Sequence, residues 1–164
     1  MKKIFLSILV SLTGLCVFAQ KGQVGAGLNF NYTPSLESGL SLNNFGLSAK
    51  LQYGFTNALR GELLVGYDFK DQGVGLFHAS ANLHYLIHVG DRFKFYPILG
   101  AGYALLTVDW GYFGSGSDSK FLANGGLGAE YDFSEHLTAG FEVKYQYIKD
   151  FSRLPISLGL TYKF

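Results

Sequence analysis

The residues of this chain best suited to chemistry are a histidine and a serine two positions apart, His78 and Ser80, followed by Asn82. Side chains at positions i and i+2 of a β-strand share one face. On a strand, the imidazole of His78 could therefore act as a base on the hydroxyl of Ser80 and create a nucleophile. The same spacing also fits a row of polar side chains that only hydrogen-bond to one another. Which interpretation holds depends on the face of the strand that these residues occupy.

Metal binding is a second chemistry to consider, because His78, His84 and His88 occur within one short segment. Along a strand with ~3.3 Å per residue, His84 and His88 lie roughly 13 Å apart. Zinc ligands lie about 2.1 Å from the ion, so these histidines cannot share one without carboxylates from other strands. The Gly/Ser-rich run at 114–119 lacks the lysine and the strand-to-helix context of a phosphate-binding loop. The sequence therefore predicts neither a metal site nor a cofactor.

Charged residues form the third group of candidates, because they recur on the polar face of alternating segments. They are Lys50, Arg60, Glu62, Lys94, Glu130, Glu142 and Lys144. Burying such groups singly is strongly unfavourable, whereas opposite charges can pair across a narrow space. Two interpretations stay open: a salt-bridged plug, and the lining of a narrow ion path. In a plug, Arg60 is expected to pair with Glu62 or Glu142.

The elements that must position these residues are β-strands, because apolar and polar residues alternate with period two along most of the chain. Eight alternating segments occur, at about 24–32, 45–55, 59–68, 77–89, 93–108, 121–133, 137–147 and 156–164. The fifth is the least regular, since Ile98 and Leu106 fall on its polar face and Pro97 cannot donate to a β-ladder. We expect Pro97 at a rim or bulge, and the register around it stays open.

The connections between these segments alternate in length. Short turns at 56–58, 90–92 and 134–136 alternate with longer links at 33–43, 70–75, 109–119 and 149–154. This rhythm is typical of an up-and-down barrel with short turns at one end and longer loops at the other. The sequence therefore predicts an all-β protein, an eight-stranded antiparallel up-and-down transmembrane β-barrel with both termini at one end.

Volume decides which face of such a barrel points outward. The interior of an eight-stranded barrel is only just wide enough for side chains to fill it. The apolar faces carry many Phe, Tyr and Leu residues, and these cannot all fit inside. Aromatic residues also collect near the strand ends, as they do at membrane interfaces. The apolar face is thus expected to contact lipid; a soluble barrel with that face inside is the alternative.

The amino end of the chain differs from the rest. Lys2 and Lys3 precede an apolar run at 4–18, and Ala19 suits cleavage by a signal peptidase. This predicts a cleaved signal peptide at 1–19 and a barrel at 20–164. A membrane anchor would need roughly 20 apolar residues. Cys16 follows Leu15, where a lipoprotein signal needs a small residue, so it is expected to be part of the apolar run. No cysteine then remains for a disulfide or for thiolate chemistry.

The expected mature chain has no surplus of positive charge. The full sequence contains 13 Lys and Arg residues against 12 Asp and Glu residues, and two of the lysines lie in the predicted signal peptide. No basic surface is left to hold nucleic acid. Charged residues make up only 15% of the chain, which is low for a soluble surface and agrees with strands that are apolar on one face.

The last eight residues resemble the signature of a known family. Ser157, Gly159, Tyr162 and Phe164 have the spacing polar-x-Gly-x-x-aromatic-x-aromatic, which resembles the C-terminal signal of bacterial outer-membrane β-barrels. With this signal and the loop rhythm, the chain from 20 to 164 resembles the small OmpA/OmpX-type eight-stranded outer-membrane β-barrel family, a porin-like barrel domain. The resemblance implies the outer membrane of a Gram-negative bacterium, periplasmic termini, contact with membrane lipid, and recognition of the last strand by the barrel assembly machinery.

The first function expected from this resemblance is a structural and surface-interaction role without enzymatic activity. Trp110, Tyr112 and Phe113 lie in one of the longer loops. These aromatic residues would either contact a surface ligand or extend the outer aromatic girdle. A narrow, low-conductance pore for ions or small solutes is the second possibility.

A lipid A-modifying enzyme is the third possibility, because lipid A deacylase barrels use a His-x-Ser pair on a strand. In those enzymes the pair faces lipid, whereas His78 and Ser80 are expected on the lumen face. The supporting acid of that family would fall near Arg92, where Asp91 is the nearest carboxylate. The polar-ladder interpretation of His78 and Ser80 is therefore favoured.

Overall fold

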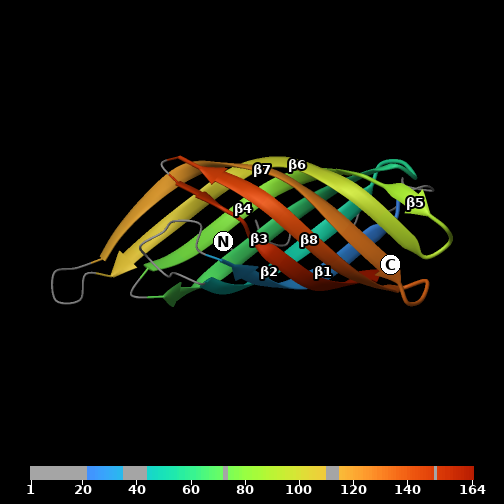
Figure 1. Ribbon diagram of the computed structural model, residues 1–164, viewed down its shortest axis with the longest axis horizontal. Helices are drawn as coiled ribbons and strands as arrows, with labels where there is room; N and C mark the ends of the chain where they lie inside the picture. Colours follow the sequence, from blue (N-terminus) through green and yellow to red (C-terminus); the bar gives the residue numbers. More distant parts are fainter. Residues whose placement is uncertain (1–21, 35–43, 72–73, 110–114, 150) are drawn as a thin grey trace, which may run out of the picture.

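All regular structure in the described part of the chain is β-strand (Figure 1). The computed structural model describes residues 22–34, 44–71, 74–109, 115–149 and 151–164. The strands are β1 (Val24–Thr33), β2 (Asn44–Gly54), β3 (Leu59–Asp71), β4 (Val74–Tyr85), β5 (Ile87–Val89), β6 (Phe93–Asp109), β7 (Ser115–Asp132), β8 (Leu137–Ile148), β9 (Phe151–Arg153) and β10 (Ile156–Lys163). Within these ranges, no helix is long and apolar enough to cross a membrane.

The strands close into a ring. Neighbours pair antiparallel in the order β10–β1–β2–β3–β4–β6–β7–β8, and β8 pairs with β10 to complete the barrel. The short strand β5 continues β4 beside β6, and β9 continues β10 beside β8. The ten strands therefore occupy eight positions around the barrel, which confirms the predicted eight-stranded antiparallel architecture.

The break between β4 and β5 lies opposite Pro97. The β4–β6 ladder ends at the pair His84–Ile98, and the β5–β6 ladder resumes at Ile87–Phe95 without a shift of register. The β6–β7 ladder runs through Pro97 unbroken. Proline has no N–H to donate. The hydrogen-bonded ladder of β6 is therefore interrupted at Pro97 on the edge that faces β4 and β5, and it is continuous on the edge that faces β7. Pro97 thus lies inside a regular strand and not at the expected rim or bulge.

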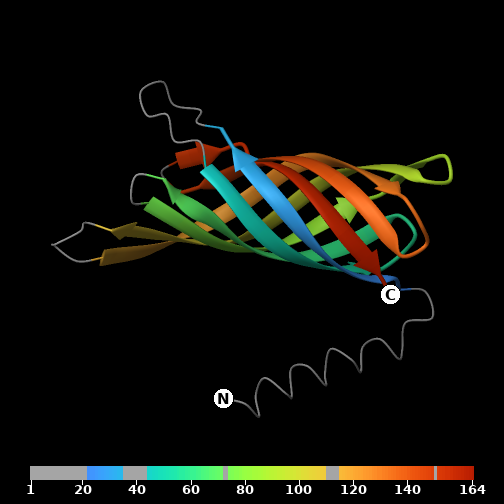
Figure 2. The same cartoon turned by 90° about the horizontal axis from the view of Figure 1, so that it is seen from below.

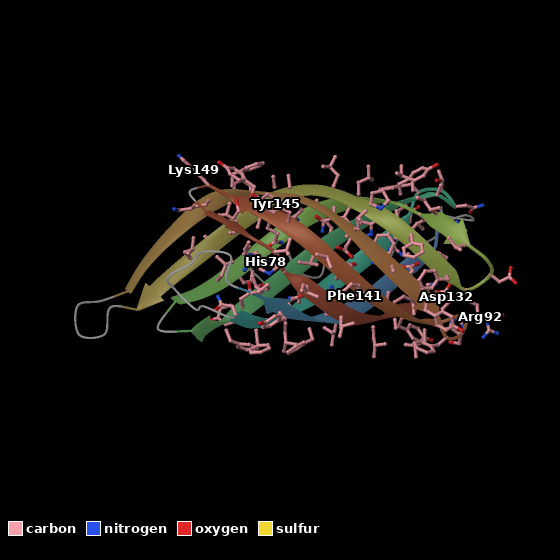
Figure 3. The ribbon with its side chains drawn as sticks, viewed as in Figure 1. His78, Arg92, Asp132, Phe141, Tyr145 and Lys149 are labelled. Carbon is pink, nitrogen blue, oxygen red and sulfur yellow. The ribbon has the colours of Figure 1, made fainter. Side chains whose placement is uncertain are left out.

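The two faces of the barrel wall differ sharply in exposure. Leu28, Leu99 and Leu127 point outward and are 68%, 73% and 68% exposed, whereas Glu142 and Lys144 point inward and are 1% and 3% exposed. Side chains therefore stand along the outer surface as well as inside the barrel (Figure 3). The apolar face is the outer one, as the volume argument predicts, and it has the polarity expected of a surface in contact with lipid.

The outward aromatic rings form two belts, one near each end of the barrel. Ring pairs of one belt are Tyr53–Phe55, Phe93–Phe95, Tyr131–Phe133 and Tyr162–Phe164; those of the other are Phe30–Phe45, Tyr67–Phe69 and Tyr103–Phe121. Aromatic side chains favour the two interfaces of a bilayer. The apolar band between the belts is thus the part expected in the hydrocarbon.

The two ends of the barrel have different connections (Figure 2). The turn end carries the tight connections at 55–58, 90–92 and 133–136, together with Gly22 and the carboxyl-terminal Phe164. At Gly90 the backbone has a φ of 79°, a conformation that glycine adopts without strain. At the opposite, loop end, β6 and β7 are the longest strands, with 17 and 18 residues. Their hairpin reaches beyond β8 at this end (Figures 1 and 2), while β4 stays paired with β6 as far as the pair Val74–Val108.

Candidate functional site: the barrel interior

Glycines on the inner face make room for the interior side chains. Five of them lie directly opposite a large polar residue of the next strand: Gly46–Asp68, Gly66–His78, Gly100–Asn82, Gly128–Tyr96 and Gly159–Asn29. A Cβ atom at Gly128 would lie 2.3 Å from the Tyr96 ring, and one at Gly66 would lie 2.5 Å from His78 Nε2. Each large side chain therefore lies over the backbone of its neighbour, which a residue with a Cβ would prevent.

Glu142 of β8 is the centre of one interior network. Its carboxylate lies 2.7 Å from Lys144 Nζ and 3.6 Å from Lys50 Nζ. Tyr96 crosses over Gly128 and donates its hydroxyl hydrogen to Glu142 Oε1 at 3.0 Å. One buried carboxylate thus holds two ammonium groups and a phenol that come from β2, β6 and β8.

Arg60 is the centre of a second network, nearer the turn end. Its Nη1 lies 2.7 Å from Glu130 Oε2. The sequence had suggested Glu62 or Glu142 as the partner, and the ion pair is instead formed with Glu130. The guanidinium also lies over the Tyr96 ring, with Cζ 4.8 Å from the ring centroid. The partner depends on the stagger between distant strands, which no local pattern in the sequence records.

An imidazole links the two networks. The ring of His84 stacks on that of Tyr96, with centroids 4.9 Å apart. Its Nδ1 lies 3.3 Å from Arg60 Nε, which donates to it. The ring is fully buried, so it fills the space between the two charge clusters.

Glu62 is held mainly by amides. Its carboxylate accepts hydrogen bonds from Gln52 Nε2 at 2.9 Å and Asn82 Nδ2 at 3.0 Å. His84 Nε2 lies 3.7 Å from the same carboxylate. Asn124 extends the chain by donating to Asn82 Oδ1 at 2.8 Å. The polar row that begins at Asn82 therefore runs across the lumen and is not confined to one strand.

A small polar cavity opens at the turn end. It has a volume of about 170 Å³ and is lined in part by Gln52, Arg60, His88, Lys94, Glu130 and Lys163. Lys94 bridges Glu130 and Asp132, at 3.4 and 2.6 Å, and Lys163 also binds Asp132. The cavity walls include both partners of the Arg60–Glu130 pair.

The loop half of the lumen is built differently. Arg153 pairs with Asp68 and donates to Gln146 at 2.6 Å. Beside them lies a buried apolar cluster that sequence reasoning missed: Leu76, Ala104, Leu122 and Ile148, with Leu106 packed against it. These residues share the phase of the polar face, so in the sequence they appear only as irregularities of the alternation, as Leu106 does in the fifth segment. Together with Ile98, which is 3% exposed, they make the interior partly apolar.

His78 and Ser80 both face the lumen, and no hydrogen bond joins their side chains. Both are buried, and His78 lies inside the barrel in Figure 3. Neither ring nitrogen of His78 has a hydrogen-bond partner. Ser80 Oγ accepts a hydrogen from Asn82 Nδ2 at 3.4 Å. The contact between base and nucleophile that the sequence suggested is therefore not made in this structure. Among the described residues, no group of three His, Cys, Asp or Glu side chains could hold a metal ion.

The residues of the C-terminal signal lie on both faces of the closing strand. Ser157 is buried, and Gly159 leaves room for Asn29. Tyr162 and Phe164 point outward, with ring centroids 5.2 Å apart. β10 pairs with β1 on one edge and β8 on the other. Of the remaining candidates, Trp110, Tyr112 and Phe113 lie outside the described residues.

The fold and the interior together define a class of protein. A closed eight-stranded barrel with an apolar, aromatic-belted outer surface and a salt-bridged interior is a small transmembrane β-barrel. The sequence profile of the family described as "Outer membrane protein beta-barrel domain" matches residues 5–164. The chain belongs to this family, which places it in the bacterial outer membrane.

Solved structures show the same fold at low sequence identity. Neisserial surface protein A matches with a TM-score of 0.71 and 17% identity, covering 87% of this chain and 97% of its own. OprG from Pseudomonas aeruginosa matches at 0.71 and 16%, covering 88% and 96%. Ail of Yersinia pestis, in complex with the heparin analogue sucrose octasulfate, matches at 0.68 and 19%, covering 88% and 100%. No curated protein sequence matches the chain.

Proposed function

We propose that the protein is a structural component of the outer membrane with a closed lumen, a surface-interaction role at its loop end and no enzymatic activity. The observation that carries the proposal is the pairing of the buried charges. Each buried charged side chain in the described lumen has an opposite charge within 4.0 Å, or, for Glu62, two amide donors and a histidine. Such a network fills the narrow lumen with side chains, and it leaves no buried charge without a partner, which would be strongly destabilising.

Single-channel recording tests the closed lumen. Refolded barrel, checked by the heat-dependent gel shift of folded barrels, is added to a planar bilayer. We expect no discrete current steps from the wild type. Reproducible steps whose ion selectivity changes in Glu130→Gln would contradict the plug and establish the narrow pore instead.

The turn end is proposed to lie in the periplasm, because it carries the short connections and both ends of the barrel domain. The chain's one cysteine is Cys16, in the predicted signal peptide, so single cysteines can report topology. Asn57 and Lys149 are exposed at opposite ends of the barrel. On intact cells, a membrane-impermeant maleimide is expected to label Lys149→Cys but to reach Asn57→Cys only after lysis. The reverse pattern would invert the orientation.

The surface-interaction role is supported by the projecting β6–β7 hairpin and by Ail, whose structure contains a heparin analogue. The hairpin flanks the stretch that holds Trp110, which is the only tryptophan of the chain. Titration with sucrose octasulfate is expected to change the tryptophan fluorescence of the wild type and leave Trp110→Phe without a signal. Unchanged fluorescence, together with no binding by calorimetry, would remove sulfated glycans as the ligand class.

The absence of catalysis is proposed because no hydrogen bond joins the side chains of His78 and Ser80. Lipid A from cells that carry the wild type is expected to have the same acyl pattern as lipid A from cells that carry Ser80→Ala. A pattern that differs between the two strains would establish the lipid-modifying alternative.

A further inference from the structure

The outward face of the barrel is hollowed over two small residues. Gly61 of β3 and Ala81 of β4 point outward and line a groove of about 580 Å³ on the lipid-facing side. Its other outward-facing walls include Leu51, Tyr53, Phe55, Leu63, Leu83 and Leu99. Apart from the Tyr53 hydroxyl, these outward side chains are hydrocarbon. The groove therefore offers an apolar surface with almost no hydrogen-bonding capacity.

The pairing register explains the shape of the groove. Gly61 pairs with Leu83, and Leu63 pairs with Ala81. The two small residues are therefore diagonal neighbours, and a leucine stands on each side of the diagonal. Leu63 and Leu83 are 60% and 44% exposed, so they rise above the small side chain of Ala81, while the Phe55 ring covers Gly61. The result is a trough, whereas a uniform row of leucines would give a flat surface.

The groove begins under the aromatic belt of the turn end. A Cβ atom at Gly61 would lie only 2.8 Å from the Phe55 ring, so this ring rests directly on the glycine. Phe55 also packs edge-on against Tyr53, with centroids 5.3 Å apart. From this aromatic end the trough leads along Ala81 towards the middle of the apolar band.

We propose that this groove binds one acyl chain of a phospholipid. The groove is continuous with the outward surface that lipid covers, and hydrocarbon is the only solvent available there. An acyl chain matches its walls because it needs no hydrogen-bond partner. The proposal rests on the orientation given above, in which the turn end is periplasmic. The bound molecule then belongs to the inner leaflet and is a phospholipid, whereas lipid A belongs to the outer leaflet.

Lipid retention measured by native mass spectrometry tests the groove. The barrel is reconstituted with phosphatidylethanolamine and lipid A and then transferred to detergent. We expect one phosphatidylethanolamine to remain on the wild type and Ala81→Leu, whose added side chain fills the groove, to lower this retention by at least about fivefold. Ala49→Leu is the matched control, because Ala49 is also outward and exposed but lies on β2 outside the groove. Equal retention by all three proteins would overturn the proposal, as would preferential retention of lipid A.

Cross-linking provides a second test that needs no variant. A phospholipid with a photoreactive diazirine in its acyl chain is expected to label β3 and β4 around Leu63 and Leu83 more than the rest of the wild-type barrel. Labelling spread evenly around the barrel would overturn the site. If the maleimide labels Asn57→Cys and not Lys149→Cys on intact cells, only the assignment of the bound lipid to the inner leaflet is overturned. Lipid retention and cross-linking at the groove are measured independently of the orientation of the barrel.

Discussion

Glu142 is the residue on which the lumen network depends most. Its carboxylate compensates two ammonium groups, Lys50 and Lys144, and accepts the Tyr96 hydroxyl hydrogen. All of these partners are buried. Two charges and a phenol would therefore lose their partner together if the carboxylate were removed, and water reaches none of them easily.

At this scale we predict that Glu142→Ala lowers the free energy of unfolding by about 3–5 kcal/mol, because it leaves buried charges uncompensated. Urea unfolding in phospholipid vesicles, followed by circular dichroism and the gel shift, measures the change. Glu135→Ala in the exposed 133–136 turn is the control, and its free energy of unfolding should stay within about 0.5 kcal/mol of the wild type. Equal unfolding midpoints for the two variants would show that the network does not stabilise the fold.

Among the elements, β7 shows how the barrel uses its glycines. Gly128 faces inward and supports Tyr96, whereas a Cβ atom at the outward Gly125 would have no atom within 4 Å. The two residues differ by three positions in one strand but have opposite surroundings. Glycine is thus required where a neighbouring side chain crosses the backbone, and is replaceable where the strand only faces lipid.

The corresponding prediction compares alanine at the two positions. Gly128→Ala should lower the free energy of unfolding by about 1–3 kcal/mol, because the new methyl group overlaps the Tyr96 ring and forces it to move. Gly125→Ala should be neutral or should stabilise the barrel by up to about 1 kcal/mol, because it restricts the unfolded chain. The same unfolding assay measures both. A larger loss at Gly125 than at Gly128 would contradict this account.

The elements also show how far the sequence could be interpreted. Alternation is a local property, so it predicted the strands, their faces and the loop rhythm. The partner of Arg60 and the role of Tyr96 could not be predicted, because both depend on the stagger between strands. Leu76, Leu122 and Ile148 were missed for another reason. An apolar residue at a position of the inward, polar face only interrupts the alternation, and the sequence does not show that several such residues pack together.

The whole molecule is closed by its last strand. Besides the β1–β10 and β8–β10 ladders, Phe164 N donates to Val24 O at 2.9 Å and Lys163 N to His136 O at 2.7 Å. Phe164 itself is 73% exposed on the outer surface. Its ring contacts Tyr162 in the turn-end belt, with centroids 5.2 Å apart, and the backbone of β10 closes the ladder. We propose that the ring also serves recognition during assembly.

We predict that Phe164→Ala reduces the amount of folded barrel in cells several-fold while changing the free energy of unfolding of the refolded protein by less than about 1 kcal/mol. Phe133→Ala is the matched control, because Phe133 is another exposed aromatic residue of the turn-end belt but lies outside β10. Heat-modifiable barrel is quantified in outer-membrane fractions and after refolding. Equal cellular amounts of the two variants would exclude a special role for the last residue.

The projecting β6–β7 hairpin sets the reach of the molecule. On the β8 side, the ladder ends at the pair Leu122–Ile148, and in the ladders of the described residues Ser115–Lys120 pair with β6. On its other edge, β6 is paired with β4 as far as Val74–Val108. Six residues of strand correspond to about 20 Å along the chain. Strands that are hydrogen-bonded side by side, here β7, β6 and β4, resist bending far better than a single chain does. If the loop end faces outward, as proposed, a partner captured at the end of this ribbon would be held at a fixed height above the bilayer, and the length of the hairpin would determine which surfaces the cell can touch.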